Sequence, residues 1–70
     1  MEYAFLKQPT NGLFHAGIVQ SAVRPISVKI KSVTVATHTR PWVVFVRCNE
    51  ELTSDEHAAV KAIIERLGGD

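Results

Sequence analysis

Apolar and polar residues alternate along much of the first 48 positions, which is the pattern of half-buried β-strands. The segment Glu2–Lys7 shows this alternation first, and the dipeptide Asn11-Gly12 follows it. Asn-Gly is a strong signal for a tight hairpin turn, because both residues tolerate positive φ. We therefore expect a hairpin in which Phe14, Ala16 and Ile18 belong to the second strand, and a longer loop would shift its register.

A further strand is expected over residues 26–37. Its apolar positions alternate up to Ile30 and then move by one place to Val33 and Val35. One extra residue near Ser32 would return all of them to one face, and that is what a β-bulge does. The alternative is a strand whose covering partner changes halfway along its length.

The segment Trp42–Cys48 is apolar at nearly every position, so both of its faces are apolar. Such a run is typical of a central strand that is buried on two sides. A single helix can cover only one side. Either the sheet curls towards a barrel, or another molecule covers the second face, and we expect the latter.

Residues 53–67 are predicted to form an amphipathic helix. Thr53 and Glu56 have the spacing of a capping box, and the pair Gly68-Gly69 supplies a stop signal after the last turn. The apolar residues recur at the i, i+3, i+4 and i+7 positions of one helical face, and they are Val60, Ile63, Ile64 and Leu67.

These elements together predict one α+β domain over residues 1–70. Residues 2–48 would form a mainly antiparallel sheet of about four strands, and the C-terminal helix at about residues 53–67 would pack across one face. Seventy residues are too few for two domains. A core of this size supplies only about 3–5 kcal/mol, so small domains commonly gain stability from a partner.

Charge divides the chain into two parts. Residues 1–48 contain six lysines and arginines against a single acidic residue, whereas residues 49–70 contain two basic and six acidic residues. This asymmetry indicates either an anionic partner for the β part or head-to-tail self-association.

Cys48 is the only cysteine, so no disulfide forms within the chain. A lone thiol fits a reducing compartment. The first residues show no signal-peptide pattern, and the longest apolar run is far shorter than the ~20 residues that cross a bilayer as a helix. We expect a cytoplasmic protein that makes no membrane contact.

The residues that could carry chemistry do not form a recognisable motif. The three histidines and Cys48 lack the paired spacing of a structural zinc site. Cys48 ends an apolar strand, where a free cysteine acts as a small apolar side chain. We therefore expect neither metal nor cofactor and no catalytic residue, so the protein is predicted not to be an enzyme.

The function expected from the sequence is protein–protein binding, either to a larger protein or to a second copy as a homodimer. Such a module would act as a regulator or inhibitor by occupying its partner. Nucleic-acid binding on the basic sheet is the alternative, with Trp42 available for base stacking. The predicted partner-binding residues are Lys29, Lys31, Arg40, Trp42, Phe45 and Arg47.

Overall fold

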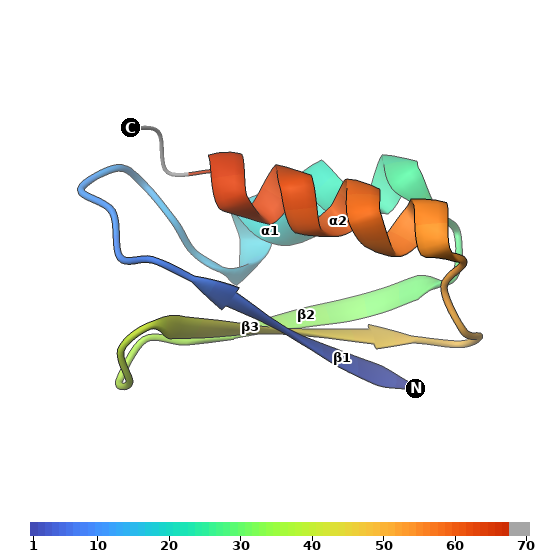
Figure 1. Ribbon diagram of the computed structural model, residues 1–70, viewed down its shortest axis with the longest axis horizontal. Coiled ribbons are helices and arrows are strands. Elements are labelled where there is room, and N and C mark those ends of the chain that lie inside the picture. The colour runs from blue at the N-terminus through green and yellow to red at the C-terminus, as the bar shows by residue number, and fades with distance from the viewer. Residues whose placement is uncertain (68–70) are drawn as a thin grey trace.

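The computed structural model describes residues 1–67 as three β-strands and two α-helices in one α+β unit (Figure 1). The predicted α+β class is confirmed, with three strands in place of about four and two helices in place of one. In chain order the elements are β1 (Glu2–Lys7), α1 (Ala16–Val23), a 3₁₀ turn η1 (Arg24–Ile26), β2 (Ile30–Ala36), β3 (Trp42–Cys48) and α2 (Ser54–Arg66).

The sheet is antiparallel throughout, and its strand order is β1-β3-β2. The prediction that Trp42–Cys48 is the central strand is therefore confirmed. Figure 1 shows that α1 and α2 lie side by side on one face of this sheet. The opposite face, which we call the open face, carries neither helix.

The predicted hairpin is wrong, because the segment that was expected to return as a strand forms α1. Asn11 and Gly12 lie in the loop that connects β1 to this helix. The His15 ring caps the helix: its Nδ1 accepts hydrogen bonds from the backbone N–H groups of Gly17 and Ile18 at 3.1 and 3.4 Å. Histidine is not among the residues that usually cap helices.

The strand predicted over residues 26–37 is shorter at both ends and begins at Ile30. Val28, one of the alternating apolar positions of the predicted strand, lies before β2 and is 95% exposed. The predicted irregularity is confirmed, since the register of β2 against β3 shifts between Ile30 and Ser32. The bulge returns Val33 to the buried side of the sheet.

The core lies between the sheet and the two helices. Every second residue of β3 points into it, and Val44 and Val46 are fully buried. The expectation that β3 is buried on both sides is wrong for this chain alone, because Val43 and Phe45 on the open face are only half-buried. The helices contribute four fully buried side chains to the core: Val19, Val23, Val60 and Ile64.

The predicted capping box starts α2. The Thr53 hydroxyl accepts a hydrogen bond from the Glu56 N–H at 3.1 Å, and the Glu56 carboxylate accepts one from the Thr53 N–H at 2.9 Å. The helix therefore begins where the sequence predicts. The predicted stop at Gly68-Gly69 lies outside the described residues.

Candidate protein-binding groove

The outer edge of β1 presents backbone groups that the sheet does not use. Met1 and Cys48 exchange both of their backbone hydrogen bonds, at 2.7 and 2.9 Å. In an antiparallel pair such hydrogen-bonded pairs alternate along the strands. The register pairs Tyr3 with Val46 and Phe5 with Val44, so the N–H and C=O groups of Ala4 and Leu6 point away from β3.

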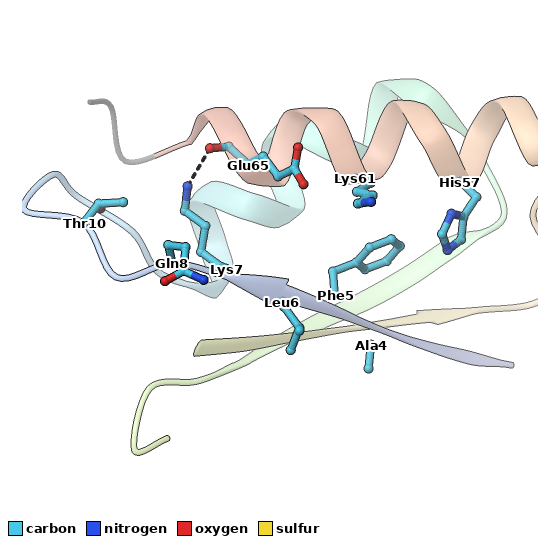
Figure 2. Close-up of a pocket in the computed structure, with 9 residues that line it drawn as sticks. All are labelled: Ala4, Phe5, Leu6, Lys7, Gln8, Thr10, His57, Lys61 and Glu65. Carbon is cyan, nitrogen blue, oxygen red and sulfur yellow. Dashed lines mark hydrogen bonds between the residues drawn. The ribbon is translucent and has the colours of Figure 1, made fainter. Parts of the chain in front are cut away.

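A groove of about 630 Å³ runs along this edge, between β1 and α2 (Figure 2). This volume lies in the range of ordinary binding sites, about 300–1,000 Å³. One wall is β1 with the residues that follow it, and the other wall is one side of α2. The lining residues are Ala4, Phe5, Leu6, Lys7, Gln8, Thr10, His57, Lys61 and Glu65.

The α2 wall of the groove is a stripe of three residues at four-residue spacing: His57, Lys61 and Glu65. Residues four apart lie on the same side of a helix. The His57 ring packs against Phe5, with centroids 4.9 Å apart, and makes a T-shaped contact with the Tyr3 ring, with centroids 5.6 Å apart. The groove is therefore aromatic at its His57 end and charged further along α2.

Lys7 joins the two walls at the other end. It is 3% exposed, and its Nζ donates a hydrogen bond to the backbone carbonyl of Glu65 at 2.8 Å (Figure 2). This carbonyl lies at the C-terminal end of α2, where a cation is favourable. Burial lowers the pKa of Lys7, and the negative charge of Glu65 partly opposes that effect.

One polar atom of the groove is left without a partner. Among residues 1–67, the Thr10 hydroxyl is the buried side-chain oxygen that makes no hydrogen bond. A buried hydroxyl without a hydrogen bond costs about 1–3 kcal/mol. Thr10 is also one of the residues that line the groove.

The other edge of the sheet is protected in a way that β1 is not. The register shift between Ile30 and Ser32 places a bulge in β2, and the exposed Lys31 lies within it. Bulges and lysines are common features that keep an edge strand from pairing with another chain. The register of β1 against β3 is regular over all six residues, so β1 is the edge that is ready to pair.

The open face is apolar but small. Its exposed or half-buried apolar side chains are Ala4, Leu6, Ala36, Val43 and Phe45. Three strands of six residues cover about 300 Å² at the usual strand spacing and rise. A stable interface buries about 800 Å² on each partner.

Two predicted binding residues are engaged within the chain. Lys29 donates hydrogen bonds to the Glu56 carboxylate at 3.0 Å and to the Glu51 carbonyl at 3.1 Å. Trp42 lies on the helix side of the sheet and stacks on Phe14, with ring centroids 5.6 Å apart. Its ring is therefore not placed on the surface where Phe45 lies.

The remaining predicted residues are spread over three places. Arg40 is exposed in the turn before β3, and Lys31 lies at the bulge of β2. Phe45 and Arg47 share the open face, since they are two residues apart on β3. The six predicted residues thus do not form one surface, and none of them lines the groove.

The groups considered for chemistry stay apart. Within residues 1–67, no three His, Cys, Asp or Glu side chains are placed to hold a metal ion. Cys48 is buried, and its burial raises the pKa of the thiol. Neither of the two helices in this part of the chain has the length and apolar character needed to cross a bilayer.

The groove residues were not identified from the sequence. The spacing of His57, Lys61 and Glu65 indicates one side of the helix, but it does not tell what that side faces. β1 could be recognised as a strand, yet its place at an edge depends on the strand order. Comparison with protein-family models, with curated proteins and with solved structures found no match.

Proposed function

We propose that this protein is a non-enzymatic binding module that joins another protein chain by β-strand addition at the free edge of β1. The observation that carries the proposal is the regular, unprotected edge of β1 with a groove beside it. Main-chain hydrogen bonds to an exposed edge supply the affinity in this binding mode, and neighbouring pockets supply the specificity.

An added strand would satisfy several groups at once. Its backbone would bond the outward N–H and C=O groups of Ala4 and Leu6. Its side chains would alternate between the groove on one side and the open face on the other. The exposed Leu6, at 65%, would gain an apolar neighbour.

As a regulator or inhibitor, such a module would act by occupying a strand or a flexible segment of a larger protein. The free thiol of Cys48 fits a reducing, cytoplasmic setting. The alternative of nucleic-acid binding has less support, because Lys29 is paired with Glu56 and Trp42 is stacked on Phe14.

Amide hydrogen exchange tests the proposal at single residues. The probe is a capped heptapeptide in which valine and threonine alternate, with valine at both ends, added to the protein at millimolar concentration. We expect protection to rise at the amides of Ala4 and Leu6, while Val33 and Val35 at the opposite edge stay unchanged. Absence of protection at Ala4 and Leu6, or protection at β2 instead, would contradict the proposal.

A further inference from the structure

The charges of the groove are not evenly matched. Glu65 has a cation beside it, because the buried Lys7 donates a hydrogen bond to its backbone carbonyl at 2.8 Å. The one ion pair within residues 1–67 joins Lys29 to Glu56, at the other end of α2. Lys61, exposed in the middle of the α2 wall, forms no ion pair with a carboxylate of these residues.

The spacing of the two walls fixes which part of an added strand meets Lys61. Residues four apart on a helix are separated by about 6 Å along its axis, and every second residue of a strand by about 6.8 Å. His57 contacts Phe5 and Tyr3, and the carbonyl of Glu65 contacts Lys7. Lys61 lies between them on α2, which places it near Phe5 and Leu6 along β1. The residue of an added strand that is opposite Phe5 would have its side chain on the helix side at this level.

We propose that the strand bound in the groove carries a carboxylate at the residue opposite Phe5, where it meets the ammonium group of Lys61. This inference rests on strand addition at β1. The occupant is thus an extended segment of another protein. Its side chains that face α2 include an acidic residue, and its alternate side chains, which lie on the same side as the open face, are apolar.

A second copy of this chain does not fit this description. If its β1 paired with β1, the residues facing α2 would be Tyr3, Phe5 and Lys7, none of which is acidic. A second copy would also bring its own α2 to the groove. Neighbouring strands lie about 4.8 Å apart, whereas packed helices need 8–10 Å. A single extended segment avoids this crowding.

Two variants of the heptapeptide test the charge assignment, one with glutamate and one with lysine at the central position. The alternating sequence reads the same in both directions, so either strand orientation places the charge alike. We expect the glutamate peptide to bind about twofold to fivefold more tightly than the lysine peptide, in the range of exposed charge pairs. The preference should shrink at high salt.

The variant Lys61→Glu should reverse this order, and Lys31→Glu at the opposite edge should leave it unchanged as the matched control. If the two peptides bind equally while the amides of Ala4 and Leu6 are still protected, the proposed contact between a carboxylate and Lys61 is wrong, but strand addition at β1 remains supported. If neither peptide protects these amides, strand addition fails as well. If protection of the Ala4 and Leu6 amides rises with protein concentration when no peptide is added, the occupant is a second copy of this chain and the inference is wrong.

Discussion

The Nζ of Lys7 lies 2.8 Å from the backbone carbonyl oxygen of Glu65, so a buried lysine of an edge strand is bound to the last turn of a helix 58 residues further along the chain. The same ammonium group lies 5.4 Å from the centroid of the Phe14 ring. The contact fixes the distance between β1 and α2, which are the two walls of the groove.

Replacing Lys7 by methionine should destabilise the protein by about 1–3 kcal/mol, because a hydrogen bond from a charged donor is lost and a carbonyl is left unpaired. The difference from wild type should depend on pH. Burial lowers the folded-state pKa of Lys7 below 10.5. Below that folded pKa, Lys7 is charged in the folded protein, so the free energy of unfolding carries the full cost of burying the charge. The cost disappears as the pH rises from the folded pKa to 10.5.

Urea unfolding of both proteins over the alkaline range measures this effect. The stability of wild type should rise relative to that of Lys7→Met as the pH increases from the folded-state pKa of Lys7 to 10.5. A difference that stays constant across the window would show that Lys7 is not desolvated in the folded protein.

Acid should weaken the start of α2 through Glu56. The backbone N–H of Thr53 first, and the Lys29 ammonium second, lower the pKa of this carboxyl from 4.5 to about 2. A lowered carboxyl pKa adds stability above the unfolded value of 4.5, and this stability is lost as the pH falls towards 2. The advantage of wild type over Glu56→Gln should shrink over this range.

Chemical denaturation at several pH values between 7 and 2 checks this expectation. Asp55→Asn is the matched control, because Asp55 lies in the same first turn and its side chain forms no hydrogen bond within residues 1–67. An advantage of wild type over Glu56→Gln that does not change with pH would contradict the role of the capping carboxylate.

Truncation of two large apolar residues should change stability by very different amounts. Ile64 is fully buried between α2 and the sheet, so Ile64→Ala should cost about 2–5 kcal/mol. A core that supplies about 3–5 kcal/mol cannot absorb much of that loss, and the variant should be largely unfolded at room temperature. Leu6, at 65% exposed, should change stability by less than about 0.5 kcal/mol as Leu6→Ala.

Circular dichroism during urea unfolding separates these two cases. A large loss for Leu6→Ala would mean that the open face is covered in the free protein. A Leu6→Ala variant that keeps its stability but binds the heptapeptide more weakly would support the contact between Leu6 and an added strand.

The elements that the sequence predicts well are those with several signals that agree. The capping box at Thr53 and the apolar stripe through Ile64 both indicate α2, and the phase change after Ile30 indicates the bulge. The α1 helix was missed because Asn11-Gly12 is a strong turn signal, whereas the capping residue His15 is an unusual one. The four-residue spacing of Val19 and Val23, with alanines nearby, was the available helical signal.

The site could not be predicted in the same way, because it depends on which strand lies at the edge. Trp42 and Lys29 have residue types that are common at binding surfaces, yet the fold uses both within the chain. Ala4 contributes its backbone to the proposed site rather than its side chain. A backbone group that is free to bind becomes visible only once the strand order and the register are known.

The most direct test of strand addition is to remove one outward N–H group of β1 and leave every side chain in place. Chemical synthesis, with ligation at the Arg47–Cys48 junction, allows the amide nitrogen of Ala4 to be methylated. Methylation at Phe5 is the matched control, because that N–H belongs to the ladder with β3 and its loss should destabilise the fold. We predict that N-methyl-Ala4 protein keeps its stability and no longer binds the heptapeptide. If it binds the heptapeptide as wild type does, the edge of β1 is not the binding site.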